Sequence, residues 1–417
     1  MKHCILKQVI LGLALTSALG CASVFAAGPR TSTKAQKLSP GAKVKVRNQS
    51  GPITVEGWDQ DTVQATADGS DQPSDVTVQV EGAGLCSISP NMQGHPHRGE
   101  VRLVIKMPRS ASIDSLSTGR GSVQVTNISG SVTVTTGNGD LRITQVGPLN
   151  ASTSSGDIQV RSVAGDAKLQ SGNGDISLAD VSGAATVRSS GGGVTATRTG
   201  RLFVHTNNGD VNAASIDGSA ALESDNGGLR VKDVKGNVLA KMRSGDFKGE
   251  NISGLINLAI TSGSVRAVNI GGDAKVIAIS SDIDIKCLTG SAELATISGS
   301  ITLAGIGGNV SASSTSGDVT LAGNLLPKFR YKLKSVSGDV SLLIPPDTGG
   351  FTATLSSYSG EIETDFPLKL DSSIERGPVN RRVIGHFGDG QADVGLDSFS
   401  GTAKIAKLTP GRITPCK

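Results

Sequence analysis

The most regularly spaced residues that could do chemistry are aspartates that follow a glycine. A Gly-Asp pair, or a small-residue substitute for it, precedes an apolar-x-apolar triplet at intervals of 17 or 18 residues. The positions are Ser122, Asp140, Asp157, Asp175, Gly193, Asp210, Gly228, Asp246, Ser264, Asp282, Ser300 and Asp318. If the units stack, these carboxylates form a column, and clustered carboxylate oxygens are typical calcium ligands. A metal site is therefore the first chemistry to consider.

The detailed pattern argues against such a metal site. Calcium-binding repeats of the Gly-Gly-x-Gly-x-Asp type have one residue between Gly and Asp, whereas Gly139 and Asp140 are adjacent. Gly and Ser also interrupt the column, which spreads like charges apart instead of gathering ligands. An Asp side chain readily bonds its own turn. We therefore expect each corner aspartate to cap its own turn, and we expect no metal and no cofactor.

A second chemistry, glycan cleavage, needs two carboxylates close together on one outward strand face. The outward positions of the first strand of each unit are Arg142, Gln159, Ser177, Thr195, Asn212, Arg230, Lys248, Arg266 and Asp284. Those of the second strand are Gln170, Arg188, His205, Glu223, Lys241, Ala259, Ile277 and Ala295. Neither series has two acids in adjacent units, so we expect no catalytic residue and no enzyme.

The first series does contain a basic row. Arg230, Lys248 and Arg266 fall on successive units, and one interpretation is a face with weak affinity for acidic glycans or lipid headgroups. The other interpretation is a solvated face that keeps the protein soluble. His95 and His97 have no acidic or cysteine partner nearby, and two histidines alone rarely hold a metal. We assign them to a loop.

The repeat itself predicts the scaffold that positions these residues. In one unit, Ile158 and Val160 alternate with polar neighbours, as a half-buried strand requires. Val163 then points inward at a turn, where Gly165 supplies a permissive backbone, and a second strand follows at residues 167–169. Two short strands and two turns make a coil of about 18 residues that buries its apolar face only by stacking on another coil. The sequence predicts an all-β fold, a parallel β-solenoid.

A meander of antiparallel hairpins is the alternative, because Asn-Gly pairs such as Asn173-Gly174 suit hairpin turns. However, the units repeat in phase with one spacing, whereas hairpins would give a period of two units. Between Ile113 and Gly323 there is one proline, Pro148, so nearly every backbone N–H can join a ladder. These observations favour the solenoid.

Composition and charge agree with a thin rod. The 417 residues include 55 glycines but only 8 Phe, 2 Tyr and 1 Trp, whereas a large globular core usually relies on aromatic side chains for buried area. The formal net charge is +4, from 40 basic and 36 acidic residues. So small an excess indicates no strong polyanion partner and no nucleic-acid partner.

Residues 1–26 are predicted to be a signal peptide. Lys2 and Lys7 make a basic start, and the apolar run at 9–20 is too short to span a bilayer. Small residues precede Ala27, so cleavage before it is the preferred interpretation. The alternative is lipidation at Cys21, and the protein would contact a membrane only in that case. Either route predicts an exported protein, periplasmic or on the cell surface.

Three cysteines follow the signal: Cys86, Cys287 and Cys416. In an oxidising compartment an odd number allows one disulfide and one free thiol. The sequence does not decide the pairing. Pairing Cys86 with Cys416 is a guess, made because Cys287 lies inside a repeat where other units carry Ser, Asp or Asn.

The rod needs capped ends, because open sheet edges recruit other chains. We expect an N-terminal β cap at residues 28–112, regular coils at 113–323, longer coils with a C-terminal cap at 324–407, and a tail at 408–417. The N-terminal region has alternating strands and the single tryptophan, Trp58.

Several short motifs occur in a fixed order along the chain. They are the opening GPITVEGWD at 51–59, the strand end VIKMP at 104–108, the Ser-Gly-Asp repeats, then DFPL at 365–368 and GDG at 388–390. In this order they resemble the bacterial β-strand-repeat family labelled "putative adhesin", whose function is unknown. The resemblance covers nearly all the mature chain and departs from the family at Pro52 and in the loop at 91–99. It implies an exported repeat rod and carries no catalytic residue.

Together these features predict a non-enzymatic, exported cell-envelope protein. We expect its solenoid flank or capped end to bind a glycan, another polymer or an envelope protein. The alternative is a structural or self-associating envelope scaffold without a specific ligand.

Overall fold

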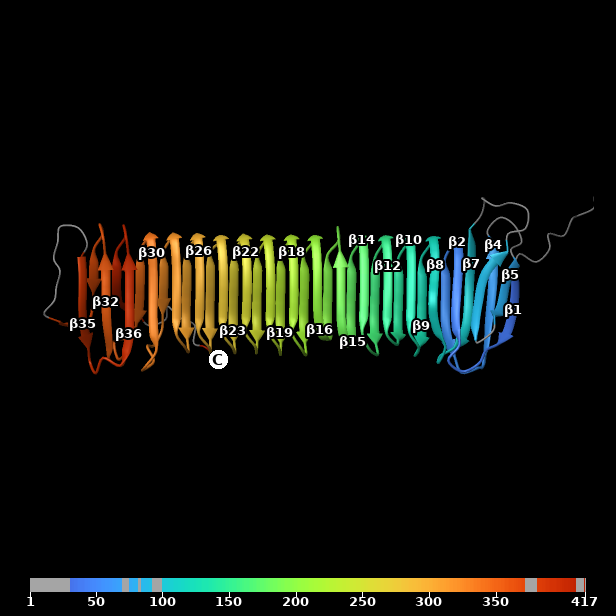
Figure 1. The fold of residues 1–417 in the computed structure, drawn as a ribbon, viewed down its shortest axis with the longest axis horizontal. Helices are drawn as coiled ribbons and strands as arrows, with labels where there is room; N and C mark the ends of the chain where they lie inside the picture. The colour runs from blue at the N-terminus through green and yellow to red at the C-terminus, as the bar shows by residue number, and fades with distance from the viewer. Residues whose placement is uncertain are drawn as a thin grey trace, which may run out of the picture.

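The computed structural model of the protein describes residues 31–69, 75–81, 84–91, 100–371, 381–409 and 416. In these ranges every regular element is a β-strand, and the strands stack into one long rod (Figure 1). Successive coils pair in parallel at a spacing of 17 or 18 residues. The predicted all-β, parallel β-solenoid is therefore confirmed. Within the same ranges, no helix is long and apolar enough to cross a membrane.

The strands fall into three groups along the rod. At the N-terminal end lie β1 (Thr31–Lys37), β2 (Lys43–Ser50), β3 (Ile53–Trp58), β4 (Thr62–Gly69), β5 (Asp75–Glu81), β6 (Leu85–Asn91), β7 (Val101–Pro108) and β8 (Ser112–Arg120). The stacked coils comprise β9 (Val123–Ile128), β10 (Val132–Asn138), β11 (Leu141–Val146), β12 (Leu149–Ser155), β13 (Ile158–Val163), β14 (Ala167–Asn173), β15 (Ile176–Ser189), β16 (Val194–Asn208), β17 (Val211–Ile216), β18 (Ala220–Asn226), β19 (Leu229–Val234), β20 (Val238–Ser244), β21 (Phe247–Ile252), β22 (Ile256–Ser262), β23 (Val265–Ile270), β24 (Ala274–Ser280), β25 (Ile283–Leu288), β26 (Ala292–Ser298), β27 (Ile301–Ile306), β28 (Val310–Ser316), β29 (Val319–Ala322), β30 (Arg330–Ser337) and β31 (Val340–Ile344). At the C-terminal end lie β32 (Phe351–Ser357), β33 (Ile362–Thr364), β34 (Lys369–Leu370), β35 (Arg381–Phe387), β36 (Ala392–Ser398) and β37 (Ala403–Lys407).

Each coil contributes one extended segment to each of two facing sheets, and β15 and β16 each run through both without a break. In the coil of β13 and β14, Ile158 pairs with Leu141 of β11 on one side and with Ile176 of β15 on the other. Ala167 of β14 pairs in the same way with Leu149 of β12. We call the sheet of β13 the first-strand sheet and the sheet of β14 the second-strand sheet. Every outward side chain therefore stands in a column with its counterparts one coil away.

The core lies between the two sheets and is one layer of mostly aliphatic side chains per coil. In this coil Ile158, Val160 and Val163 point inward from β13, and Ala167 and Leu169 from β14, and all five are buried. Each coil presents apolar surface of this kind to the coil above it and to the coil below it. These side chains are therefore buried only when the neighbouring coils are present.

A left-handed backbone residue makes Val163 point inward. Ser162 precedes it with φ of 60°, so two outward residues separate the inward Val160 and Val163 where a plain strand would have one. The same non-glycine conformation recurs on ten coils, with φ between 53° and 61°, at Asn127, Gln145, Ser162, Asp180, Arg198, Ser215, Asp233, Asn251, Asn269 and Cys287. This column was not predicted from the sequence. We call it the left-handed edge.

Glycine is required at the opposite corner for a steric reason. Gly174 has φ of 137°, and a Cβ there would overlap the carbonyl oxygen of Gly156 in the preceding coil. The same overlap recurs at Gly139 and Gly227. These glycines therefore allow the backbones to stack at the close spacing that parallel pairing needs.

Antiparallel strands extend the stack at both ends. At the N-terminal end, β7 pairs in parallel with β3, β4 pairs antiparallel with β7, and β1 pairs antiparallel with β4. At the C-terminal end, β32 follows β36, and β35 and β34 then add antiparallel pairs. The outer strands β33 and β34 are three and two residues long. Short outer strands of this kind leave little edge for pairing with another chain.

A disulfide ties the end of the chain back to the rod. Cys416 bonds to Cys287 on the left-handed edge, so the guess that Cys86 pairs with Cys416 is wrong. Cys86 lies buried in the N-terminal end, and this burial raises the pKa of its thiol to about 11. Other units carry polar residues at the position of Cys287, which made a disulfide there seem unfavourable from the sequence. However, those side chains line an exposed edge that another segment can reach.

Loss of the disulfide should destabilise the coils that it closes. It joins residues 129 apart, and in the chain-entropy model such a loop contributes about 5 kcal/mol, although measured values are more often about 2–4 kcal/mol. We expect the Cys287→Ser, Cys416→Ser double variant to melt at a lower temperature than the native protein, as measured by circular dichroism.

Adding reductant to the native protein should lower its melting temperature to that of the double variant, and reductant should leave the double variant unchanged. Alkylation of the denatured, unreduced protein should modify Cys86 and neither disulfide cysteine. A native melting temperature that stays constant after reduction, with reduction verified by mass, would contradict this prediction.

Candidate functional site

The corner aspartates hold adjacent coils together. In eight cases an Asp Oδ1 accepts a hydrogen bond from the backbone N–H of the corner residue one coil further on, at 2.8 to 3.1 Å. The prediction that each aspartate caps its own turn is therefore wrong, because the aspartate bonds the corner of the next coil. At Asp246, hydrogen bonds from the Ser264 backbone and hydroxyl hold the carboxyl pKa below its usual value.

The column of corner aspartates therefore has a structural role, which is to bond one coil to the next. Each of these carboxylates is engaged by an N–H of the next coil, and glycine or serine follows in several coils. In the described part of the chain, no three His, Cys, Asp or Glu side chains gather as metal ligands would.

The basic row lies on the first-strand sheet, as the repeat predicted. Arg230 of β19 is in register with Lys248 of β21, and Lys248 with Arg266 of β23. Arg266 pairs with Asp284 at 3.4 Å, and Lys286 contacts the same carboxylate at 3.3 Å. Arg230 and Lys248 are exposed, and neither forms an ion pair with the described residues.

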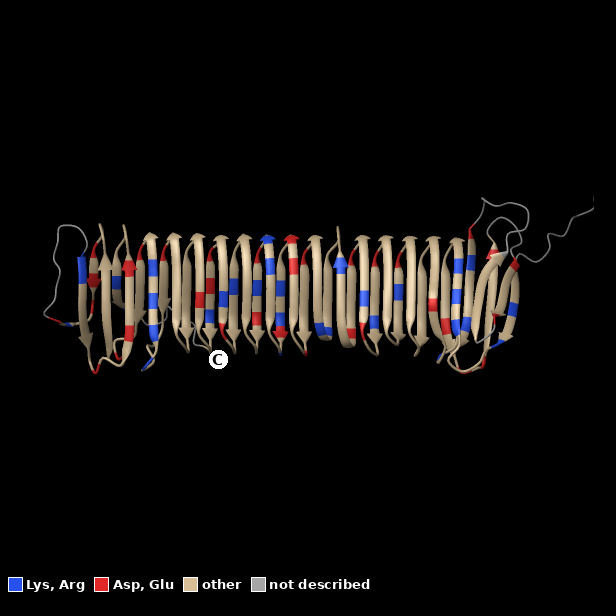
Figure 2. Cartoon of the chain, in the orientation of Figure 1, with Lys and Arg blue, Asp and Glu red and all other residues tan. Residues whose placement is uncertain are grey.

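The neighbouring outward positions preserve the positive charge of this face. Lys232 pairs with Glu250 at 3.6 Å. Across β19, β21, β23 and β25 the outward charges are therefore five cations and three carboxylates, at Arg230, Lys232, Lys248, Arg266, Lys286, Asp233, Glu250 and Asp284. The basic bands on these neighbouring strands lie in the middle of the rod (Figure 2). We call this the basic face.

The second-strand sheet contains a slot that sequence reasoning missed. Phe203 of β16, Ala221 of β18 and Leu239 of β20 stand in one outward column. Phe203 is 45% exposed and Leu239 is 54% exposed, and the small Ala221 lies between them. Two strand spacings separate the bulky side chains by about 9.6 Å along the rod. Ala221 is therefore the floor of the slot, and Phe203 and Leu239 are its walls.

A row of polar side chains runs beside the slot on the same coils. His205 lies next to Phe203, Glu223 next to Ala221, and Lys241 next to Leu239. A His205 ring nitrogen is 3.1 Å from a Glu223 carboxylate oxygen. Thr186, Arg188, Asn257 and Ala259 complete the lining of a concavity of about 370 Å³. The slot therefore combines apolar walls with both donors and an acceptor.

Further along the same sheet, an outward column changes from polar to apolar. It runs through Asp225, Arg243 and Thr261, and then continues through Ile279, Ile297, Thr315, Val336, Phe399 and Tyr358. The five large apolar members of the second set are between 39% and 54% exposed. The Tyr358 and Phe399 rings stack with centroids 4.6 Å apart. We call this the apolar row.

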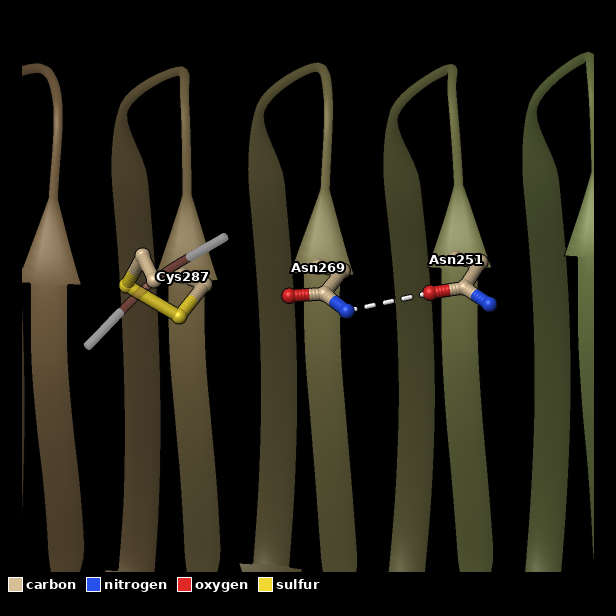
Figure 3. The surroundings of a disulfide bond; sticks show 4 residues. Asn251, Asn269 and Cys287 are labelled. Atoms are coloured by element: carbon tan, nitrogen blue, oxygen red, sulfur yellow. Dashed lines mark hydrogen bonds between the residues drawn. A yellow bond between two sulfur atoms is a disulfide. The ribbon is translucent and has the colours of Figure 1, made fainter. Parts of the chain in front are cut away.

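The disulfide marks a further distinctive place, on the left-handed edge. Asn269 donates its side-chain amide to Asn251 at 3.0 Å, and Cys287 follows them in the column (Figure 3). At Gly305 the column has no side chain, and a Cβ there would lie 2.6 Å from Cys416 Sγ. The edge is thus shaped to accept the returning chain, which is a structural role.

Some predicted features fall outside the described residues. These are the signal peptide at 1–26, the lipidation candidate Cys21, and the loop histidines His95 and His97. The slot and the apolar row carry a sequence signal that was available. Phe203, Leu239, Ile279 and Ile297 break the polar character of outward positions, and comparing each outward column from coil to coil would have revealed them.

Comparisons with known proteins agree with this architecture. The family model Toastrack DUF4097 matches residues 144–287 and 253–406, which together span more than half of the chain. No curated protein matches the sequence.

Solved structures that resemble the chain do so at low identity. One is a "putative adhesin" from Bacteroides fragilis NCTC 9343, with 12% identity, coverage of 92% of this chain and 99% of that one, and a TM-score of 0.22. A second, from Parabacteroides distasonis ATCC 8503, is also described as a "putative adhesin" and has 14% identity, 76% and 94% coverage, and a TM-score of 0.22. A third is a "putative cell adhesion protein" from Clostridium sporogenes ATCC 15579, with 8% identity, 90% and 98% coverage, and a TM-score of 0.17.

The matched residues include coils that pair in parallel register and that the corner aspartates join. The resemblance inferred from the ordered motifs is thereby confirmed, and this chain belongs to the Toastrack DUF4097 family.

Proposed function

We propose that this protein is an exported, non-enzymatic cell-envelope protein that binds an anionic polymer along its basic face. The observation that carries the proposal is the in-register row of Arg230, Lys248 and Arg266 on adjacent strands. Two of these three cations have no carboxylate partner among the described residues. A linear polyanion lying along the rod would meet one cation at each strand spacing of about 4.8 Å.

The physical basis of such binding is electrostatic attraction over an extended surface. The individual contacts are exposed, and each is worth about 0.5 kcal/mol because water and salt screen the charges. Affinity would therefore come from several contacts in line, and the repeat supplies this arrangement. A globular anion would contact fewer of these cations than a linear polymer.

Export is part of the proposal and rests on the predicted signal peptide. The disulfide between Cys287 and Cys416 supports it, because stable disulfides are typical of oxidising compartments. Mass spectrometry of the mature N-terminus should find either Ala27 as the first residue or a lipid on Cys21. An N-terminus that retains residues 1–20 would contradict export by either route.

Binding of the acidic polysaccharide polygalacturonate tests the basic face. We expect measurable binding that weakens as salt is raised, and a triple variant with Arg230→Gln, Lys248→Gln and Arg266→Gln should bind roughly tenfold more weakly. Isothermal titration calorimetry at several salt concentrations provides the measurement.

A triple variant with Arg142→Gln, Arg161→Gln and Lys168→Gln is the matched control, because it removes the same charge from exposed positions elsewhere on the rod. The control should retain near-native affinity. Equal losses in the two variants would show that net charge alone drives binding, and absence of binding by the native protein would exclude the proposal.

A self-associating scaffold is the second candidate function, and the apolar row favours it. Its exposed side chains lie in a line along the rod axis, so two antiparallel copies could bring the same row together in an isologous contact. Burying these side chains would stabilise the pair by about 25 cal/mol for each Å² removed from water.

Sedimentation velocity at several concentrations tests this second function. The native protein should form larger species as concentration rises, and an Ile279→Thr, Ile297→Thr variant should stay monomeric. Leu255→Thr is the control, since Leu255 is also exposed but lies away from the row. A native protein that remains monomeric at every concentration would exclude self-association.

A further inference from the structure

We infer that the slot between Phe203 and Leu239 is a binding site for a neutral sugar unit of a glycan. It lies on the second-strand sheet, whereas the basic face lies on the first-strand sheet. The inference is therefore independent of the anionic-polymer proposal.

The slot has room for one flat group. Its walls stand on coils separated by one intervening coil, so their backbones are about 9.6 Å apart. Once the Phe203 ring and the Leu239 side chain occupy part of that distance, one layer of atoms can insert above Ala221. The concavity of about 370 Å³ lies within the range of small-ligand sites, about 300 to 1,000 Å³. A single ring therefore fits, with the adjoining unit of a polymer at the mouth of the slot.

The arrangement of walls and polar row matches the two surfaces of a pyranose. A sugar ring presents C–H groups on its faces and hydroxyls around its rim. Phe203 and Leu239 would contact the faces, and the aromatic ring supplies a large rigid surface for that purpose. Glu223 would accept hydrogen bonds from hydroxyls, and Lys241 would donate to them.

The charges of the polar row argue against a simple ion as the ligand. Glu223 stands in the middle of the row, between His205 and Lys241, and would repel a simple anion. Arg188 and Lys241 stand on either side of the His205–Glu223 pair, and these two cations would repel a simple cation. A ligand that both donates and accepts without net charge satisfies all three groups, and hydroxyls have this property.

An apolar side chain or an acyl chain fits the walls but not the row. Neither offers Glu223 or Lys241 a hydrogen-bond partner, and both groups stay exposed to water. A sugar in the same place also bonds both groups through its hydroxyls. The combination of walls and row therefore favours a sugar over a peptide or a lipid.

In this column, the walled slot occurs once among the described coils. The residues that precede and follow it in the outward column are Lys168, Thr186, Asn257 and Lys275. None of these four is a bulky apolar residue, so only the three coils of Phe203, Ala221 and Leu239 form a walled slot in this column.

The test uses the full-length protein with cellohexaose, maltohexaose and N-acetylated chitohexaose as probes. Saturation-transfer-difference NMR detects weak binding, and titration gives the affinity. We expect at least one probe to bind, with saturation strongest on ring protons that contact Phe203. The Ala221→Leu variant fills the slot from its floor and should weaken binding at least tenfold, and Phe203→Ala should do the same by removing a wall.

Ser313→Leu is the matched control, because it adds the same side chain at an outward position of β28 in the same sheet. It should leave affinity unchanged, and circular dichroism should show that each variant melts like the native protein. Polygalacturonate binding should also survive Ala221→Leu, so a failure here is distinct from a failure of the basic-face proposal. The inference is overturned if no probe binds the native protein, or if the native and Ala221→Leu proteins bind equally. A tyrosine-containing peptide that displaces a bound probe with higher affinity would also overturn it.

Discussion

Every coil of this rod takes its backbone hydrogen bonds from the coils beside it, and the rest of the structure depends on that parallel register. The corner glycines allow the backbones to approach, as the contact of Gly174 with Gly156 illustrates. The corner aspartates then fasten one coil to the next, as in the bond from the Asp175 amide to Asp157. Because the strands of each sheet stay in register in the regular coils, with a shift at the corner between Val181 and Ala184, each outward position becomes a column. Any binding surface on the strands is therefore made of such columns, which run along the rod axis.

The constant spacing was sufficient to predict the solenoid, because a two-strand unit that repeats in phase every 17 or 18 residues is typical of stacked coils. The inward alternation of Ile158 and Val160 was equally readable. The left-handed conformation at Ser162 and Arg198 was not, since such residue types rarely adopt it and only tertiary packing imposes it. The aspartate bonds were misassigned for a related reason. A local turn and the next coil offer similar N–H groups, and the sequence does not distinguish them.

The candidate surfaces were predictable to different degrees. The basic face could be predicted because Arg230, Lys248 and Arg266 occupy one column of the repeat. The slot consists of a small residue between two bulky ones in one column, with Glu223 in the adjacent column. These residues come from different coils, so no single unit of the sequence contains the pattern. When each unit is considered separately, its charged residues are noticed, but Phe203 and Leu239 are not recognised as the two walls of a slot. The two sheets face opposite directions, so the rod can present different chemistry on each flank.

The link from Cys416 to Cys287 also changes how the rod would respond to force. In an unlinked solenoid, tension on the end of the chain peels away the last strand first and then each coil in turn. Here, tension entering beyond Cys416 passes through the sulfur atoms directly to the coil of β25. The strands from β26 to β37 lie within the closed loop and carry none of that load. The C-terminal coils are thereby mechanically bypassed, and the pulling point moves into the middle of the stack.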